Sequence, residues 1–331
     1  YKIDNAFEGV LLGTAVGDSI GLPAEGLSPQ RIEANGWQNW RQRFLFGKGM
    51  MSDDTEHTIF VAQALLKHPK SAELFQRELA KKLRWWLFSL PAGTGMATAR
   101  AILKLWIGIS PTKSGVFSAG NGPAMRSAII GVFFLNDPKK LLEYVRASTE
   151  LTHSDPKALT GALAVAEIAA EISREDVFPD NIRILEIIKS LEIQDEDWRE
   201  IVNKIEHCLK TKLSVADFCV EMNLARGVSG YIYHTVPAVI YAILQFRGSY
   251  KESLEALLNC GGDVDTTGAI LGSILGAQGR SVNIPAEWVE NIIEWPRSVS
   301  LMKRISEQMM KYSEGQSYRN VGYFLPFILI R

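Results

Sequence analysis

Two segments of the chain carry a glycine at every fourth position. Residues four apart lie on the same face of a helix, so each segment would present a stripe of glycine. Glycine in a helix interior costs roughly 1 kcal/mol relative to alanine, and this repeated cost indicates that two helix backbones approach closely. We therefore predict direct contact between two helices, whose glycines are Gly9, Gly13, Gly17 and Gly21 in the first and Gly268, Gly272 and Gly276 in the second.

The apolar pattern predicts helices along nearly the whole chain. Apolar residues recur at intervals of three and four, the period of an amphipathic helix, in residues 57–68, 123–135, 156–172 and 236–246. Helix start signals support this reading, because proline favours the first helical position and aspartate the N-cap. The residues concerned are Pro123, Pro156 and Pro237, with Asp155 as a cap.

These patterns predict an all-α fold without a second domain. No tract rich in glycine, serine or proline divides the chain, so residues 1–331 are expected to form a single compact multi-helical domain. The segment 174–217 is rich in charged residues and isoleucine. We expect it to form amphipathic helices at the periphery.

Composition excludes several classes of protein. Apolar residues make up 47% of the chain and charged residues 22%, which is typical of a soluble globular protein. The net charge of −1 creates no long-range field toward polyanions. We therefore expect no nucleic-acid patch, no membrane partner and a monomer.

The cysteines and the N-terminal segment bear on the compartment. Cys208, Cys219 and Cys260 are odd in number and lack metal-binding spacing, so reduced thiols and a cytoplasmic location are expected. Glu8 and Asp18 interrupt the apolar residues 6–24, which excludes a secretion signal or a spanning helix there.

Two acidic clusters each stand at the start of a predicted helix. The first is Ser52-Asp53-Asp54-Thr55, and the second is Gly262-Asp263-Val264-Asp265-Thr266-Thr267. Carboxylate and hydroxyl oxygens are hard ligands that suit Mg²⁺, Mn²⁺ or Ca²⁺. If the fold brings the clusters together, four carboxylates would repel one another unless cations neutralised them. A pair of divalent ions is therefore predicted.

A simpler interpretation stays open for each cluster. Aspartate in the first turn stabilises the positive end of a helix, so the first cluster is also typical of an ordinary N-terminus. The second cluster is no EF-hand, because position twelve counted from Asp263 is Ile274 and not glutamate. If the glycine helices cross, Asp18 or Glu25 is expected beside the clusters.

A glycine loop predicts an anion site. Gly120-Asn121-Gly122-Pro123-Ala124-Met125-Arg126 would expose backbone N–H groups at a helix start, with the arginine one turn later. The segment lacks the Gly-Lys-Ser/Thr of a Walker loop, and no strand precedes it as in a Rossmann fingerprint. An ordinary loop with proline at the first helical position is the alternative.

Other polar and aromatic residues carry weaker signals. His153, before a predicted helix, is more typical of a capping or packing residue than of a ligand. One group of aromatic side chains precedes the Pro237 helix and would either line a slot for a base or belong to the core. A second group lies between Glu25 and the first acidic cluster, where a substrate flap would sit. These residues are Tyr231, Tyr233 and His234, and then Trp37, Trp40 and Arg41.

Taken in order, these motifs resemble the ADP-ribosylglycohydrolase family, which includes the dinitrogenase-reductase-activating glycohydrolases. The resemblance extends from Gly9 to about Gly279. It rests on Gly13-Thr14-Ala15-Val16-Gly17-Asp18, the first acidic cluster, the glycine loop, Leu151-Thr152-His153 and the second acidic cluster. The family is all-helical and carries two Mg²⁺ or Mn²⁺ ions, so the resemblance implies both for this chain.

The resemblance also implies roles for individual residues. The metal ligands would be Ser52, Asp53, Asp54, Asp263, Asp265 and Thr266. Glu25 would act in acid–base chemistry, and Asp53 and Asp265 would be essential for turnover. Diphosphate and ADP-ribose would be bound by Ser118, Ala119, Gly120, Asn121, Gly122, Pro123, Ala124, Arg126 and His153.

Two departures from the family pattern are visible. Ser52 stands where members usually have threonine, which keeps the hydroxyl. Gly93 stands where the nitrogenase-type members carry an aspartate, so a mechanism that depends on that aspartate is not expected here.

The resemblance implies a divalent-metal-dependent hydrolase that cleaves ADP-ribose from a protein side chain or a small molecule. Two alternatives are a non-catalytic ADP-ribose-binding protein and a hydrolase of another derivative such as O-acyl-ADP-ribose. The acceptor linkage stays open between arginine, serine, nucleic acid and a free metabolite.

Overall fold

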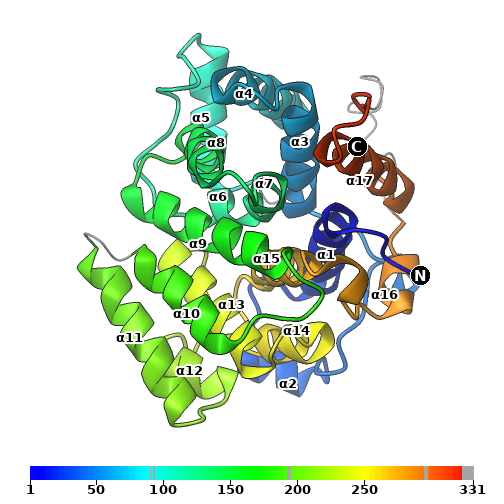
Figure 1. Ribbon diagram of the computed structural model, residues 1–331. Helices are drawn as coiled ribbons and strands as arrows, with labels where there is room; N and C mark the ends of the chain where they lie inside the picture. The colour runs from blue at the N-terminus through cyan, green and yellow to red at the C-terminus, as the bar shows by residue number, and fades with distance from the viewer. Residues whose placement is uncertain (90, 92–93, 192–194, 294–296, 323–331) are drawn as a thin grey trace.

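A computed structural model describes residues 1–89, 91, 94–191, 195–293 and 297–322. Helices make up the fold, and the described part of the chain contains isolated β-bridges but no strand (Figure 1). The all-α prediction is confirmed. Among the described helices, none is both long and apolar enough to cross a membrane.

The centre of the molecule is the antiparallel pair of α1 (Ala6–Gly21) and α15 (Val264–Gly276). A Cβ atom added at Gly9 would lie 2.0 Å from the carbonyl oxygen of Gly276, and one at Gly13 would lie 2.1 Å from that of Gly272. Such distances allow no side chain. The predicted glycine contact is confirmed along the full length of both helices.

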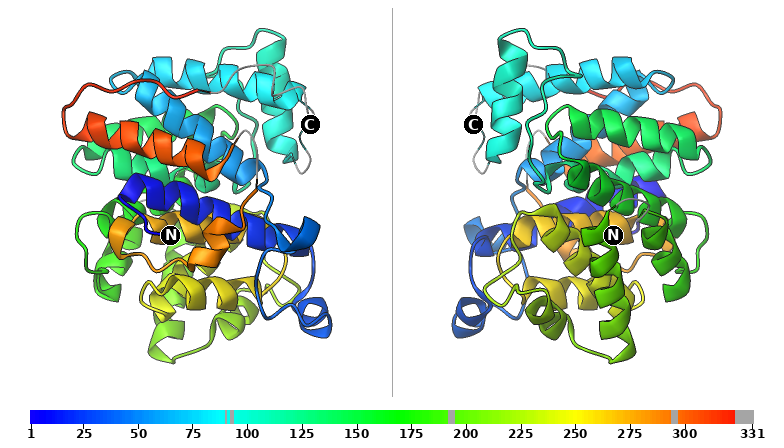
Figure 2. Two further views of the ribbon diagram at one scale, coloured as in Figure 1. Left: turned by 90° about the vertical axis from the view of Figure 1, so that its right-hand side faces the viewer. Right: turned by 90° about the vertical axis from the view of Figure 1, so that its left-hand side faces the viewer.

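The remaining helices surround this pair on two sides (Figures 1 and 2). In Figure 1 one group lies above it: α3 (Asp53–Lys67), α4 (Ala72–Phe88), α5 (Met96–Trp106), α6 (Gly122–Met125), α7 (Ala128–Phe133), α8 (Pro138–Glu150) and α17 (Val299–Ser313). The other group lies below: α2 (Pro29–Ala34), α10 (Asn181–Ser190), α11 (Glu196–Lys210), α12 (Val215–Glu221), α13 (Ile232–Gln245) and α14 (Tyr250–Leu258).

Helix α9 (Pro156–Ile172) contacts α7, α13 and α15 and so connects the two groups. Short elements complete the fold, namely α16 (Ala286–Glu290), η1 (Leu22–Ala24), η2 (Leu45–Gly47) and η3 (Gly279–Ser281). One continuous cluster of buried apolar side chains extends from Ile3 to Met309.

Local signals predicted some helix ends correctly. Helix α9 covers residues 156–172 as expected, and the Asp155 carboxylate accepts a hydrogen bond of 2.9 Å from the Lys157 N–H at its start. Residues 174–217 contain the predicted outer helices α10, α11 and the start of α12.

Three predicted boundaries are wrong. Residues 123–135 form two helices, because Arg126 leaves the helical conformation (φ −115°, ψ 11°). Pro237 lies inside α13, which begins at Ile232; its missing N–H removes one bond from a helix that packed neighbours hold in place. The sequence pattern would end the first glycine helix at Gly17-Asp18, before a loop that holds Glu25, but α1 continues to Gly21.

Candidate functional site

The two acidic clusters lie side by side, although they are far apart in the sequence. Ser52 is the N-cap of α3 and Asp263 precedes α15. The Asp54 carboxylate accepts hydrogen bonds from the hydroxyl of Ser52 at 3.0 Å and from that of Thr266 at 3.2 Å. One carboxylate oxygen therefore joins the starts of both helices.

Asp18 attaches α1 to the start of α3. Its buried carboxylate accepts the backbone N–H of Ser52 at 2.9 Å and the N–H and hydroxyl of Thr55 at 3.2 and 2.5 Å. Burial raises the pKa of Asp18 to about 7, although these hydrogen bonds act in the opposite direction. The expectation that the crossing of the glycine helices brings Asp18 to the clusters is confirmed.

The carboxylates at this end are crowded. Burial first, and then neighbouring carboxylates, raise the pKa of Asp53, Asp54 and Asp265 well above the usual value. Within the described ranges, none of these three side chains forms an ion pair. The Oδ1 atom of Asp54 is buried and has no hydrogen-bond partner in the part of the chain that the structure describes.

The backbone of the second cluster makes a tight turn. Gly261 and Gly262 have φ values of 68° and 86°, a conformation that glycine adopts without strain. The N–H of Gly26 donates to the carbonyl of Gly262 at 2.8 Å, and the N–H of Gly262 donates to that of Leu27 at 2.8 Å. This pairing places Glu25 next to the cluster.

Glu25 differs from the aspartates because its side chain is exposed. Partial desolvation and the negative charge of Asp263 raise its pKa. A raised pKa lets a carboxyl group hold a proton closer to neutral pH, which general acid catalysis needs. The acid–base role that the resemblance implies for Glu25 stays a prediction.

The glycine loop reaches the second cluster through Asn121. The Asn121 side-chain amide donates to the carboxylate of Asp263 at 2.7 Å and to the hydroxyl of Thr235 at 3.1 Å. Its backbone N–H donates to the carbonyl of Gly230 at 2.9 Å. Sequence reasoning missed Thr235 and Gly230, for which no motif offered a signal.

His153 lies beneath the glycine loop. A Cβ atom added at Gly120 would lie 3.0 Å from the His153 Nε2 atom, and one at Gly122 would lie 3.2 Å from its Cε1 atom. Burial, followed by the nearby Arg126 charge, lowers the pKa of His153 to about 3, so its ring is neutral. A side chain at either glycine would have to push the His153 ring aside.

Arg126 lies in a different position from the one expected. Its guanidinium is fully buried and donates to the Ser148 hydroxyl at 3.0 Å, the Ser148 carbonyl at 2.9 Å and the Thr152 hydroxyl at 2.7 Å. Its remaining nitrogen is 3.3 Å from the Nδ1 atom of His57. The expected contact between Arg126 and the diphosphate is therefore wrong. Arg126 instead supports the glycine loop from below.

The other loop residues offer mainly backbone groups. Pro123 and Ala124 are buried in α6, and the Ser118 hydroxyl accepts the N–H of Gly120 at 3.3 Å. Among the described residues, the backbone N–H groups of Ala119 and Gly122 have no protein acceptor.

The aromatic residues divide between the site and the core. The Tyr231 backbone pairs with Gly120, whereas Tyr233 is buried and donates its hydroxyl to Asp195 at 2.5 Å. Trp40 is buried and donates to the Asn259 side chain at 2.8 Å. Gly93 lies outside the described residues.

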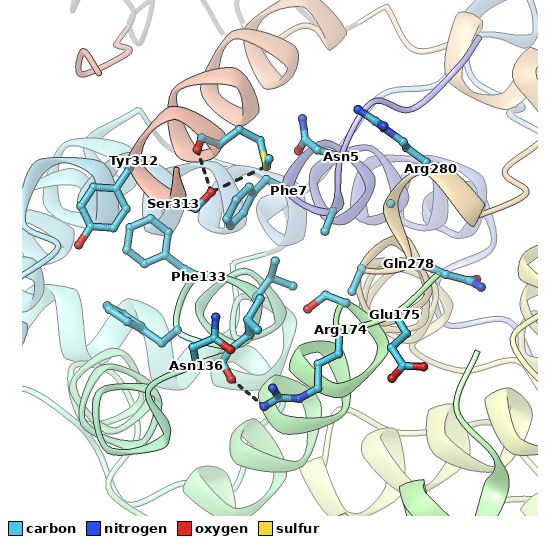
Figure 3. Close-up of a pocket in the computed structure, with 18 of the residues that line it drawn as sticks. Asn5, Phe7, Phe133, Asn136, Arg174, Glu175, Gln278, Arg280, Tyr312 and Ser313 are labelled. Atoms are coloured by element: carbon cyan, nitrogen blue, oxygen red, sulfur yellow. Dashed lines mark hydrogen bonds between the residues drawn. The ribbon is translucent and has the colours of Figure 1, made fainter. Parts of the chain in front are cut away.

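Two further observations concern metal binding at the site and the position of the cavity. No three Asp, Glu, His or Cys side chains in the described part of the chain are grouped closely enough to hold an ion as they stand. A cavity of about 1080 Å³, lined by Phe7, Phe133, Arg174 and Arg280 among others, lies at the opposite end of the α1–α15 pair and contains none of the predicted site residues (Figure 3).

The structure is thus a helical protein in which two acidic motifs and a glycine loop meet at one end of a glycine-packed helix pair. The sequence model of the ADP-ribosylglycohydrolase family matches residues 1–316. The chain belongs to the ADP-ribosylglycohydrolase family.

Relatives and solved structures agree with this assignment. An uncharacterized protein of Archaeoglobus fulgidus is 31% identical, covering 88% of this chain and 92% of its own. The ADP-ribosyl-[dinitrogen reductase] glycohydrolase of Rhodospirillum rubrum is 24% identical, covering 86% and 89%. Chicken ADP-ribosylhydrolase ARH3 is 26% identical, covering 86% and 88%. A solved ADP-ribosylglycohydrolase-related protein complex has the same fold, with a TM-score of 0.66 at 24% identity over 93% of this chain and 98% of that one.

Proposed function

We propose that the protein is a divalent-metal-dependent hydrolase that releases ADP-ribose from a protein side chain or a small molecule. Family membership and the named relatives support ADP-ribosyl hydrolase activity. One observation carries the assignment of the site: hydrogen bonds join the two acidic clusters through Asp54 and Thr266, and join the glycine loop to them through Asn121 and Asp263.

The donor set fits two Mg²⁺ or Mn²⁺ ions. A buried carboxylate oxygen without a partner on Asp54, beside two hydroxyls, is the kind of group that a hard cation satisfies. An ion would have to draw the carboxylates closer than they now lie. The residues that would hold the ions are Ser52, Asp53, Asp54, Asp263, Asp265 and Thr266.

The glycine loop is the proposed binding site for the diphosphate. The free N–H groups of Ala119 and Gly122 point to an anion contact that needs no cationic side chain. His153 and Arg126 support the loop from beneath, so its shape is set before ligand binds. Binding energy at this remote part of the ligand would orient the reacting carbon.

The proposed reaction is the displacement of the acceptor from the anomeric carbon of the ribose by water. Glu25, exposed beside Asp263, would hand its proton to the leaving acceptor atom and then take one from the attacking water. The aspartates would fix the orientation of the ribose. When bound, the metal ions would supply positive charge that stabilises the charge developing as the bond breaks.

The test is release of ADP-ribose from ADP-ribosylated peptides and amino acids, with Mg²⁺ or Mn²⁺ present and after chelation. We expect Asp53→Asn to lower kcat/KM by more than ~10-fold, about 1.4 kcal/mol, without unfolding the protein. Asp4→Asn, at the far end of α1, is the matched control and should keep the wild-type rate. An Asp53→Asn variant that retains more than about a tenth of the rate would disprove the metal-centred proposal.

A further inference from the structure

The outer face of α5 is apolar although it is exposed. Met96, Leu103 and Ile107 recur along this face and are exposed by 66%, 58% and 78%. The opposite face of α5 already packs Ile102 and Leu105 into the core. A helix that is apolar on both faces is typical of one with a partner on each.

Helix α4 extends this apolar face. Trp85 and Phe88 at its end contact each other at 6.1 Å between ring centroids, and Trp85 contacts Trp106 of α5 at 5.9 Å. The planes of both pairs lie near 80° to one another. The rings of each pair therefore pack edge to face. We name this the α4–α5 surface: Trp85, Phe88, Met96, Leu103, Trp106 and Ile107.

The two helices of the α4–α5 surface carry an excess of positive charge. From Leu79 to Asn136 the sequence contains no aspartate or glutamate, in a chain with 37 acidic residues. The guanidinium of Arg84 lies 5.3 Å from the centroid of the Trp106 ring. Lys81 and Arg100 are exposed on the same two helices. An acidic partner would complement this charge.

Helix α5 lies against the glycine loop and the segment before it. Lys104 of α5 donates to the Gly115 carbonyl at 3.0 Å, and a Cβ atom added at Gly122 would lie 3.5 Å from the Thr98 hydroxyl of the same helix. Phe117, three residues before the start of the loop, is 81% exposed. A molecule on this surface would border the proposed diphosphate site.

We infer that the α4–α5 surface docks an acidic, apolar-faced protein segment, the acceptor that carries the ADP-ribosyl group. This inference rests on the proposed function for the identity of the acceptor. A protein segment is favoured over nucleic acid because Met96, Leu103 and Ile107 offer no ring for a base to stack on, and the rings of Trp85, Phe88 and Trp106 contact one another. An amphipathic helix suits such an apolar face with charged edges.

The probe is a labelled synthetic helix with leucine on one face and glutamate on the other, measured by fluorescence anisotropy against the full chain. We expect saturable binding that weakens by ~10-fold or more, a change of about 1.4 kcal/mol, in the double variant Leu103→Ser, Ile107→Ser and in Arg100→Glu. Ile182→Ser, equally apolar and 66% exposed on α10, is the matched control and should bind as the wild type does.

Three results would overturn the inference. A helix with lysine in place of glutamate that binds equally well would remove the charge argument. Tighter binding of single-stranded poly-dT than of the acidic helix would assign the surface to nucleic acid. Peptide binding that appears only after Phe327→Asp and Ile328→Asp, in the apolar segment 323–331, would assign it to the chain's own end.

These measurements need no turnover, so docking can fail while the hydrolase proposal stands. Hydrolysis of a small ADP-ribosylated amino acid completes the separation. The Leu103→Ser, Ile107→Ser variant should keep the wild-type rate on it, because no residue of the α4–α5 surface belongs to the proposed catalytic site.

Discussion

The two ends of the α1–α15 pair share the same backbone contact but differ in how their charges are satisfied. At the end shown in Figure 3, the carboxylate of Asp4 forms an ion pair with Lys303 at 3.2 Å. The backbone carbonyl of Asp4 accepts a hydrogen bond from Arg280 at 2.7 Å. At the other end, Asp54 and Asp265 face further carboxylates and form no ion pair within the described residues.

The two ends of the helix pair share the feature that folds the protein but not the feature proposed to act in its function. The glycine contact is alike at both ends, where added Cβ atoms at Gly9 and Gly17 would each lie 2.0 Å from a carbonyl oxygen of α15. The helix pair is therefore a rigid base for either end. Only the acidic end keeps charges that folding alone does not need, and such a group is typical of a functional site.

The largest expected effect tests the shared contact. Gly9→Ala and Gly17→Ala should each lower the free energy of unfolding by about 3 kcal/mol, because a methyl group in this contact overpacks it. Without the contact, alanine would stabilise the helix by ~1 kcal/mol. The sign of the change in the free energy of unfolding therefore shows whether the helices are in contact. Urea unfolding measures the effect. Gly95→Ala, where no atom lies within 4 Å of the added carbon, is the control and should change stability little.

The pH dependence of stability tests the crowded carboxylates. The folded protein raises the pKa of Asp18 from 3.8 to about 7, so it binds more protons than the unfolded chain between these values. Stability of the metal-free protein should therefore be highest near pH 4 and fall as the pH rises to about 7. Urea unfolding in chelator at several pH values measures this. Asp18→Asn should reduce the slope, and an unchanged slope would contradict the account.

Replacing one crowded carboxylate should stabilise the apo protein. Asp54→Asn removes a buried negative charge that its neighbours repel, so metal-free stability at pH 7 should rise by ~1 kcal/mol, the scale of one pKa unit. The far-end counterpart, Glu8→Gln, weakens hydrogen bonds to a buried carboxylate and should lower stability by ~1 kcal/mol. Thermal melts in the presence of chelator compare the two variants. A change in stability of the same sign in both would contradict the contrast between the two ends.

The smallest expected effect concerns Ser52. Ser52→Ala removes the N-cap hydroxyl of α3 and should cost ~1 kcal/mol of stability. Ser52→Thr keeps the hydroxyl, and a conservative change at a partly exposed position should stay within ~0.5 kcal/mol. Thermal melts and turnover of both variants check this. A loss of activity in Ser52→Thr comparable to that in Ser52→Ala would show that keeping the hydroxyl is not sufficient and would contradict this expectation.

Much of the fold could be predicted from local signals. The glycine stripes predicted the α1–α15 contact because only close backbone approach explains their cost. The break at Arg126 could not be predicted, because its partners Ser148 and Thr152 come from a later part of the chain. Pro237 within α13 was hidden for a similar reason, since the surrounding packing overrides the lost hydrogen bond.

The candidate site shows the same division. Residue types at helix starts predicted the two acidic clusters, and their contact through Asp54 and Thr266 follows from the helix crossing. The bond from Asn121 to Asp263 depends on the path of a loop, which no spacing rule gives. The α4–α5 surface was also hidden, because a helix with two apolar faces does not reveal which one is exposed.

Calorimetric titration of ADP-ribose tests the central claim most directly. The wild-type chain and Asp265→Asn would each be titrated without metal and with excess Mn²⁺. We expect binding by the wild type that needs Mn²⁺ and is lost in Asp265→Asn, as one shared site for ligand and ions requires. Equal binding with and without metal, unchanged in Asp265→Asn, would contradict it.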